Sequence, residues 1–329
     1  MKKILGIGNA LVDILAGLKD EALLHKFSLP KGSMQHIDDD TGNRIWKDLS
    51  GLGVQRVAGG CAANTIAGAA QLGMKAGFIG KVGHDELAHV FAEDQHKHSI
   101  LPMLLKSATA TGRCMVFISP DAERTMATYL GAAIELTADD LSEDMFVGYD
   151  YFHIEGYLVQ NHELIQRAVQ LAKAQKMIVS LDMASYNVVE ANKNFLLKIV
   201  KNYVDIVFAN EAEAEIFTGK APREAVSELS KLAPVAVVKI GAEGSLVQCK
   251  AEKHVIAPFP ANAVDATGAG DLYAAGFLYG HALGLPLENC GIIGSLVASK
   301  VVEVIGPKMD ENRWHTIKTS IQKMFQNPL

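Results

Sequence analysis

Short apolar runs rich in β-branched residues alternate along this chain with longer segments of helical periodicity. The runs that predict β-strands carry few charges and lie at Ile4–Gly8, Ala76–Val82, Tyr151–Ile154, Met177–Asp182, Asp205–Ala209 and Val235–Ile240. The segments that predict helices lie between these runs, at Ala62–Leu72, Glu86–Lys97, Glu163–Ala174, Phe195–Asn202 and Ala212–Thr218. Strands that alternate with helices are typical of crossover units. The chain therefore predicts an α/β fold in three layers, with helices on both faces of a mostly parallel central sheet.

Two stretches interrupt this alternation. Residues 14–58 contain short extended pieces and turns, and residues 110–130 predict a hairpin with strands at Gly112–Ile118 and Arg124–Leu130. Both stretches fit strands outside the main sheet, and ordinary decoration of its edge is the alternative. We therefore expect a single domain over residues 1–329, with a small β lid formed by the insertions at about 14–58 and 110–130.

The last third of the chain contains a glycine-rich turn, Asp265-Ala266-Thr267-Gly268-Ala269-Gly270-Asp271. It predicts the start of a helix that runs to about Ala282, and Leu287–Ile305 predicts a second helix. A helix N-terminus exposes backbone N–H groups, and small residues let a phosphate approach them. Asp271 could then take a proton from a hydroxyl group beside that phosphate. An aspartate that only caps the helix is the alternative, but the carboxylates at both ends of the loop favour a functional site.

The composition excludes several classes of function. The net charge is −6 and no dense run of Lys and Arg occurs, so we expect no nucleic-acid partner. Asn9 and Asp13 interrupt the apolar N-terminus, and no run approaches roughly 18 apolar residues. We therefore expect no membrane segment and a cytoplasmic protein. The four cysteines show no CxxC spacing, which favours reduced thiols over zinc ligands or disulfides. Cys61 is either a reactive thiol or, as we favour, a small semi-buried residue.

Several motifs in order resemble those of the ribokinase-like, or PfkB, family of carbohydrate and nucleoside kinases. The turn ending at Asp271 resembles the family's C-terminal signature. The others are Gly59-Gly60-Cys61-Ala62-Ala63-Asn64, Gly80-Lys81-Val82-Gly83-His84-Asp85, Asn210-Glu211-Ala212-Glu213 and Lys239-Ile240-Gly241-Ala242-Glu243-Gly244. The resemblance runs from about Ile4 to Gly306 and implies a ribokinase-like fold and an ATP-dependent kinase. Two other nucleotide motifs are absent, because Leu11 replaces the third glycine of a dinucleotide fingerprint and no P-loop occurs.

The resemblance assigns roles on the ATP side of the site. It implies that Asp271 is the catalytic base and that the amides of Gly268, Ala269 and Gly270 form an anion hole. It places ATP against Asn210, Lys239, Gly241, Gly244 and Thr267. Glu213 suits Mg²⁺ bound through water, because Mg²⁺ usually keeps several waters. A solvated acidic helix start is the alternative for Glu213. The resemblance also implies a monovalent cation, K⁺, near Asp265 and Gly306.

On the acceptor side, the residues Asn9, Asp13, Gly59, Gly60 and Asn64 resemble those that family members use for substrate hydroxyls. Asp13 is expected at the end of the apolar first strand, where a carboxylate can accept hydrogen bonds from two neighbouring hydroxyls. The glycines would let the backbone approach the sugar. A loop cap and a simple turn are the alternatives for Asp13 and the glycines. The expected partner is thus a small-molecule sugar or nucleoside, and the oligomeric state is left open.

Within the family, the pattern is closest to adenosine kinases. The segments Gly8-Asn9-Ala10-Leu11-Val12-Asp13 and Arg124–Ala133 resemble theirs. Apolar residues of the expected lid suit a purine, namely Met34, Met115, Phe117 and Met126. One departure is that Asp182-Met183-Ala184-Ser185-Tyr186 stands where adenosine kinases have a segment like NLSAPF. A ribokinase- or fructokinase-like sugar kinase is therefore an alternative, and a non-catalytic regulator that binds a nucleotide or sugar is another.

Overall fold

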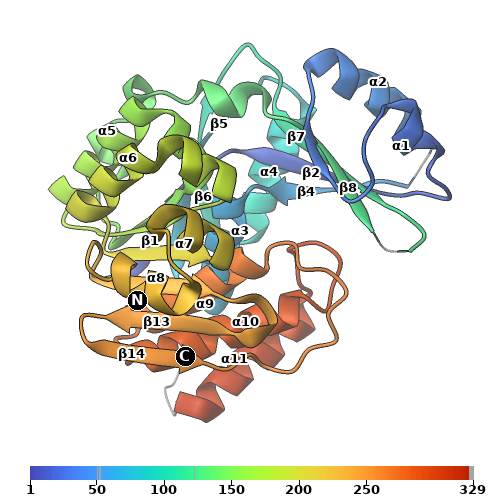
Figure 1. Cartoon of the computed structure of the whole chain (residues 1–329). Helices are drawn as coiled ribbons and strands as arrows, with labels where there is room; N and C mark the ends of the chain where they lie inside the picture. The colour runs from blue at the N-terminus through green and yellow to red at the C-terminus, as the bar shows by residue number, and fades with distance from the viewer. Residues whose placement is uncertain (50, 52, 122, 326–329) are drawn as a thin grey trace.

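The computed structural model describes residues 1–49, 51, 53–121 and 123–325. Among these residues, a nine-stranded sheet has the strand order β14-β13-β12-β11-β10-β9-β1-β5-β6 (Figure 1). Its parallel strands are β1 (Lys3–Ile7), β5 (Lys75–Val82), β6 (Ile100–Lys106), β9 (Tyr151–Glu155), β10 (Ile178–Asp182), β11 (Ile206–Asn210) and β12 (Val235–Lys239). An antiparallel pair, β13 (Ser245–Cys249) and β14 (Glu252–Ile256), extends one edge. The prediction of a mostly parallel sheet is confirmed.

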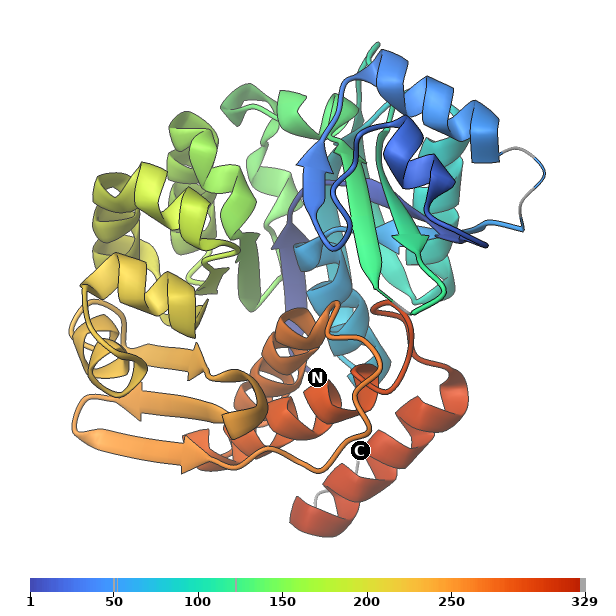
Figure 2. The same cartoon turned by 45° about the vertical axis from the view of Figure 1, so that its right-hand side comes forward.

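Helices cover both faces of this sheet (Figures 1 and 2). One core lies under α3 (Cys61–Leu72), α4 (Glu86–Lys97), α9 (Ala269–Ala282), α10 (Leu287–Val301) and α11 (Glu311–Phe325). The other lies under α5 (His162–Ala174), α6 (Tyr186–Tyr203), α7 (Glu211–Thr218) and α8 (Pro222–Leu229). Consecutive strand residues enter opposite cores, as Ile4 and Leu5 do, because side chains alternate along a strand. This is why the strands carry few charges.

A second sheet lies beside the main body and has the order β3-β8-β7-β2-β4 (Figure 2). Its strands are β2 (Leu11–Gly17), β3 (Met34–His36), β4 (Gln55–Gly59), β7 (Gly112–Ile118) and β8 (Arg124–Tyr129). The short helix α1 (Ala22–Lys26) and α2 (Asp39–Leu49) connect them. We call this sheet the small sheet. The predicted hairpin is present as β7 and β8, and the earlier insertion supplies β3 and β4.

Short 3₁₀ segments complete the connections, at Gly131–Glu135, Ala138–Asp140, Glu143–Met145, Gly156–Gln160 and Gly241–Glu243. None of the described helices is long and apolar enough to cross a membrane.

Two predicted helices have different bounds. The helix predicted at Phe195–Asn202 starts earlier, at Tyr186, and contains a non-helical residue at Asn192. The helix predicted at Leu287–Ile305 ends at Val301. The reason is tertiary: the carbonyl of Val302 accepts hydrogen bonds from the backbone N–H groups of Val264 (2.7 Å) and Asp265 (3.1 Å). The chain thus leaves the helix to hold the glycine-rich turn.

Close packing of α3 against α9 requires a glycine at position 68. A Cβ atom on Gly68 would lie 2.7 Å from Leu272 Cδ1 and 2.8 Å from Ala275 Cβ. Gly68→Ala should therefore push the two helices apart and lower the free energy of unfolding by about 1–3 kcal/mol, although alanine favours helix formation. Urea unfolding measures this loss. Gly17→Ala is the control, because no atom lies within 4 Å of a Cβ atom there. Equal stability of the Gly68 variant and the wild type would contradict the packing argument.

Candidate active site

Four neighbouring parallel strands end in polar residues at the same edge of the large sheet. Glu155, Asp182, Asn210 and Lys239 are the last residues of β9, β10, β11 and β12. Adjacent ends are in register, since Glu155 pairs with Asp182 and Asn210 pairs with Lys239. The carboxyl edge of an open parallel sheet is where ligands bind. This edge is therefore the candidate site.

The glycine-rich turn closes over this edge and begins α9. Gly268 has a φ of 76°, and a Cβ atom there would lie 2.5 Å from Pro307 Cβ, so only glycine fits. Asp265 shapes the turn from the other end. Its carboxylate accepts hydrogen bonds from the Thr267 hydroxyl (2.8 Å), the Thr267 N–H (3.0 Å) and the Gly306 N–H (2.7 Å). The backbone of residues 268–270 thus forms the N-terminus of a helix that small residues leave accessible.

Asp271 lies in the first turn of α9 and meets α3 across the helix interface. Asn64 Nδ2 donates to its carboxylate at 3.0 Å, and the Thr65 hydroxyl donates to its carbonyl at 3.2 Å. Burial raises the pKa of Asp271 to about 7. The Asn64 hydrogen bond and the Lys239 ammonium oppose this rise, while the Asp182 carboxylate adds to it. A carboxylate with a pKa near neutrality is well matched to proton transfer.

Asn210 and Glu213 form a reciprocal cap at the start of α7. The Asn210 side chain accepts from the Glu213 N–H at 2.9 Å, and the Asn210 N–H donates to the Glu213 carboxylate at 2.8 Å. Glu213 is only 2 % exposed, so it is not part of a solvated acidic helix start. Burial raises its pKa to about 7. The Glu213 carboxylate is therefore buried and is fixed in position by hydrogen bonds from Asn210.

Lys239 is paired with Asp182, which the motifs did not mark as a site residue. Its ammonium donates to the Asp182 carboxylate at 2.7 Å and lies against Gly270 of the glycine-rich turn, residues 265–271, which we call the anion loop. The other residues of its motif behave differently. Gly241 and Gly244 adopt positive φ in the turn between β12 and β13, and a Cβ atom on Gly244 would lie 2.0 Å from the Ile256 carbonyl. These two glycines thus shape the turn that follows Lys239.

On the acceptor side, a buried carboxylate holds Asn9 and the start of α3. The Asn9 side chain donates to Glu155 at 2.6 Å, and the Ala62 N–H donates to the second Glu155 oxygen at 3.0 Å. Gly60 leaves no room for a side chain, since a Cβ atom there would lie 2.3 Å from the Asn9 carbonyl. Two buried amide oxygens, Asn9 Oδ1 and Asn64 Oδ1, have no hydrogen-bond partner within the described residues. Such acceptors call for a donor from a ligand or from water.

Asp13 is not at the end of the first strand, as we expected, but inside β2 of the small sheet. A break at Gly8–Ala10 separates β1 from β2, and the apolar run through both strands hid it. The Asp13 carboxylate lies against Gly59, where a Cβ atom would be 2.3 Å from Asp13 Oδ1. Burial raises the pKa of Asp13 to about 6, against the opposing charges of Lys308 and Arg124. Asp13 and Gly59 are thus in direct contact, and a side chain at position 59 would clash with the Asp13 carboxylate.

Strand register decides which apolar residues of the small sheet share the face of Asp13. Asp13 pairs with Cys114, and Val116 pairs with Met126, which pairs with Met34. These side chains alternate with Met115 and Phe117, which are fully buried in the core on the other face. The prediction that Met115 and Phe117 suit a purine is therefore wrong for these two residues, whereas Met34 and Met126 lie on the face of Asp13.

Arg124 and Glu155 are functional candidates that sequence reasoning missed. Arg124, from β8, makes a 2.7 Å ion pair with Asp265 and a 2.7 Å hydrogen bond to Thr267. It joins the small sheet to the glycine-rich turn, and its second amino group is buried without a partner within the described residues. A polar residue directly after a predicted apolar strand is a usable signal, and Glu155 follows the predicted strand Tyr151–Ile154. For Arg124 the only signals were its place in the hairpin and in the segment Arg124–Ala133, which resembles adenosine kinases.

Cys61 begins α3 beside the site, and its thiol is held in the protonated form. Burial raises its pKa well above the ordinary value, and the carboxylates of Asp271 and Glu155 add to this rise. A protonated thiol is a poor nucleophile. This agrees with the interpretation of Cys61 as a structural residue.

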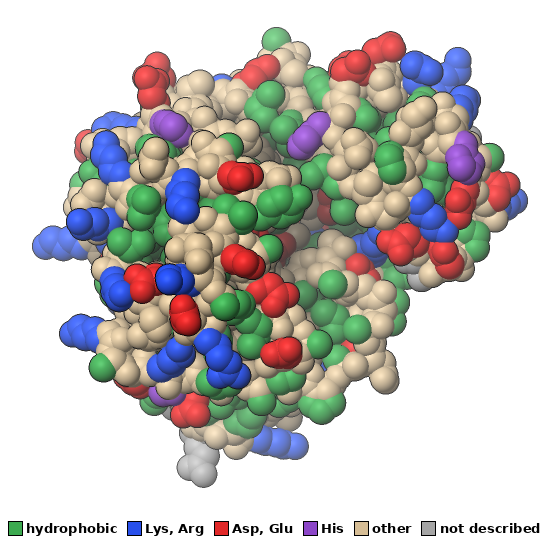
Figure 3. Space-filling model, in the orientation of Figure 1, with side chains coloured by type: hydrophobic (Ala, Val, Ile, Leu, Met, Phe, Trp, Pro, Cys, Tyr) green, Lys and Arg blue, Asp and Glu red, His purple; other side chains and the backbone are tan. Residues whose placement is uncertain are grey.

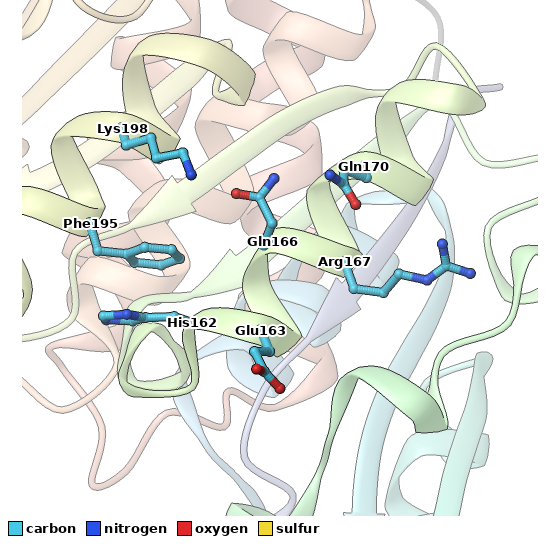
Figure 4. Close-up of a pocket in the computed structure, with 7 residues that line it drawn as sticks. All are labelled: His162, Glu163, Gln166, Arg167, Gln170, Phe195 and Lys198. Carbon is cyan, nitrogen blue, oxygen red and sulfur yellow. The ribbon is translucent and has the colours of Figure 1, made fainter.

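The surface is hollowed between the main body and the small sheet, with acidic side chains nearby (Figure 3). A separate open hollow of about 450 Å³ lies on the outer side of α5 and α6 (Figure 4). There His162 stacks on Phe195 with ring centroids 3.9 Å apart. None of the candidate site residues lines that second hollow.

The donor set suits a water-mediated magnesium ion better than a directly bound one. Across residues 1–49, 51, 53–121 and 123–325, no cluster of three or more His, Cys, Asp or Glu side chains could hold a metal ion. Glu213 offers a carboxylate whose direct partner is Asn210, which fits contact through water. The Asp265 carboxylate is bonded to Thr267, Gly306 and Arg124, so a monovalent cation there would need carbonyl ligands.

Comparison with known proteins gives consistent similarities. The model of the pfkB family of carbohydrate kinases matches residues 47–312. An adenosine kinase structure from Sinorhizobium meliloti is 33% identical, with a TM-score of 0.86 over 97% of this chain and 99% of that one. A probable sugar kinase from Rhizobium etli is 31% identical, with a TM-score of 0.86 over 97% and 98%. The adenosine kinase of Saccharomyces cerevisiae is 28% identical over 92% of this chain and 95% of its own length.

The raised pKa of Asp271 predicts a pH-dependent stability. The pKa moves from 3.8 to about 7 on folding, so the folded protein binds this proton more tightly and stability falls as the pH rises through that window. Asp271→Asn removes the buried charge. The variant should be more stable than the wild type at about pH 8, by about 1 kcal/mol or more, and the difference should shrink toward about pH 4. Denaturant unfolding at several pH values measures it.

Asp85→Asn is the matched control with the opposite sign. Asp85 caps α4 at Ala88 and accepts two hydrogen bonds from Thr111. Burial raises the pKa of Asp85, but these hydrogen bonds outweigh it and lower the pKa. The contribution of Asp85 to the free energy of unfolding is therefore present at neutral pH and is lost in acid. The control should be less stable than the wild type at neutral pH. An Asp271 variant that shows the same sign as the control would contradict the assignment.

Proposed function

Because the chain belongs to the pfkB family of carbohydrate kinases, which phosphorylate sugars or nucleosides, we propose that it transfers the γ-phosphoryl group of ATP to the 5′-hydroxyl of adenosine. The observation that carries the proposal is the 3.0 Å hydrogen bond between Asn64 and Asp271. It links the acceptor side of the site to the start of α9. A ribose held by Asn64 through its 2′ and 3′ hydroxyls would therefore have its 5′-hydroxyl near both a base and an anion-binding turn.

In the proposed mechanism, Asp271 takes the proton of the acceptor hydroxyl as its oxygen attacks the γ-phosphorus. The backbone N–H groups of Gly268, Ala269 and Gly270 would meet the charge that develops on the phosphoryl oxygens, and Lys239 lies beside Gly270. The Ala269 N–H also donates to the Ala266 carbonyl at 3.1 Å, so it would be shared with the phosphoryl group. Thr267, Asn210, Gly241 and Gly244 would complete the nucleotide side. Mg²⁺, held mainly by the phosphates and water, would neutralise phosphate charge when bound, with Glu213 and Asn210 meeting its waters.

The monovalent cation K⁺ enters no step of this mechanism. It stays a prediction from the family resemblance, with Asp265 shaping the turn beside it.

The acceptor is argued from the polar and apolar parts of its subsite. Asn9 and Asn64 each present a buried amide oxygen without a partner within the described residues, and Asp13 adds a carboxylate. These acceptors suit the 2′ and 3′ hydroxyls of a ribose, which donate. The face that carries Asp13 continues into Met126 and Met34, which suit the flat apolar face of a purine. The small sheet would then act as a lid.

A sugar kinase is the second candidate. Glu155 places a further buried carboxylate beside Asn9, which favours an acceptor with more hydroxyl groups than a nucleoside offers. A regulator that binds a nucleotide or sugar without turnover is the alternative from another class. The proposal places this protein in the cytoplasm, with a small-molecule partner.

The acceptor is tested by competitive turnover under saturating ATP. Adenosine should have a higher kcat/KM than other nucleosides, ribose or fructose, because only a purine covers the apolar face of Met34 and Met126 as well as filling the hydroxyl subsite. ADP release with each acceptor measures this. A higher kcat/KM for ribose or fructose than for every nucleoside would overturn adenosine but leave the kinase intact. Absence of ADP release with any acceptor would favour the regulator.

The base is tested by Asp271→Asn. Turnover should fall by roughly 10²–10⁴-fold, while the affinity for ATP should stay close to that of the wild type because the amide groups of the turn remain. Calorimetric titration with ATP and an assay of ADP release measure the two effects. Near-normal turnover in this variant would remove Asp271 from the mechanism.

A further inference from the structure

An ion pair crosses the carboxyl edge of the large sheet beneath the anion loop. Asp182 ends β10 and Lys239 ends β12, and β11 lies between the two strands. The ammonium of Lys239 donates to Asp182 Oδ2 at 2.7 Å, and the two side chains are 16% and 13% exposed. The pair therefore reaches over the end of β11 in a largely buried place.

The position of the ammonium is unusual for a cation. A Cβ atom on Gly270 would lie 3.0 Å from Lys239 Nζ, so the ammonium touches the first turn of α9. The N-terminus of a helix carries a partial positive charge, which disfavours a cation there. Burial also disfavours the charge on Lys239, but the Asp182 and Glu213 carboxylates outweigh this and raise its pKa. Both carboxylates thus favour the charged lysine, and Asp182, which accepts its hydrogen bond, holds it against the anion loop.

Fold stability is a weak explanation for such a pair. Replacing a buried ion pair by apolar residues is often neutral or stabilising, because desolvation offsets the attraction. A bound anion adds a second attraction for the ammonium, beyond the attraction within the ion pair that desolvation offsets. A phosphoryl group between the amides of the loop and the ammonium would meet positive charge on both sides.

We propose that Asp182 is a positioning residue of phosphoryl transfer: it holds the Lys239 ammonium beside Gly270, where the ammonium meets the group being transferred. The inference rests on the proposed kinase function and extends it to a residue outside the family motifs. In the step itself, the acceptor oxygen forms a bond to the γ-phosphorus and the bond from that phosphorus to the β–γ bridging oxygen of ATP breaks. The hydroxyl proton goes to Asp271, and ADP leaves with the bond electrons.

The same pair acts on the base. The charged and titratable groups that face Asp271 are Asp182, Lys239 and Glu155 from the sheet and Cys61 from α3, beside the Asn64 amide. The ammonium favours an ionised Asp271, whereas the Asp182 and Glu155 carboxylates disfavour it. Removing Asp182 should therefore lower the pKa of Asp271, and removing Lys239 should raise it.

The test compares Asp182→Asn, Lys239→Met and the double variant in the steady state. Lys239→Met should lower kcat by about 10²–10³-fold, the loss that follows removal of one group that stabilises transition-state charge. Asp182→Asn should lower kcat by about tenfold or more with little change in the KM for the acceptor. In the double variant the loss should equal that of Lys239→Met alone, because Asp182 acts through the lysine. The acidic limb of the pH–rate profile should move to lower pH in Asp182→Asn and to higher pH in Lys239→Met.

Asp205→Asn is the matched control. Asp205 pairs with Lys173 and accepts the Val179 N–H, near the amino ends of the same strands. The Asp205→Asn variant should have a lower melting temperature than the wild type, with an unchanged kcat and an unchanged pH–rate profile. Asp182→Asn with normal kcat, additive losses in the double variant, or an unmoved acidic limb would each overturn the inference while wild-type turnover keeps the kinase proposal. A wild type without turnover on any acceptor would overturn both.

Discussion

The carboxylate of Asp265 joins three parts of the chain that are distant in sequence. It accepts hydrogen bonds from Thr267 in the glycine-rich turn and from the N–H of Gly306 after α10, and it pairs with Arg124 of the small sheet. Hydrogen bonds that involve charged groups are about twice as strong as neutral ones. The shape of the anion loop, the course of the chain at Gly306 after α10 and the position of the small sheet therefore all depend on this one group.

Three helix N-termini hold buried or half-buried carboxylates near this edge of the sheet. Glu155 accepts the N–H of Ala62 in the first turn of α3, Glu213 is part of the cap of α7, and Asp271 lies in the first turn of α9. The positive end of each helix offsets part of the cost of burying the negative charge. Burial still raises the pKa of all three. Lys239 is instead a cation at the N-terminus of a helix, where the helix dipole disfavours its charge. The ion pair with Asp182 offsets this cost.

Packing and electrostatics are coupled through α3 and α9. Gly68 lets the two helices approach until Asn64 reaches Asp271, so a missing side chain in the core sets the environment of the proposed base. The small sheet is coupled in the same way through Gly59, which makes room for the Asp13 carboxylate. Glycines at these contacts thus bring polar groups together that the strands and helices alone would keep apart.

The sequence by itself determined the alternation of strands and helices, the hairpin at residues 112–130 and the turn that ends at Asp271. These are local patterns, readable because burial on both faces needs continuous apolar strands and a helix start needs small residues and an acid. Only the tertiary structure decided that Asp13 lies in a second sheet, that Met115 and Phe117 face its core, and that Asp182 holds Lys239. Strand register and contacts between distant segments settle such facts, because a shift of one residue turns a side chain to the other face.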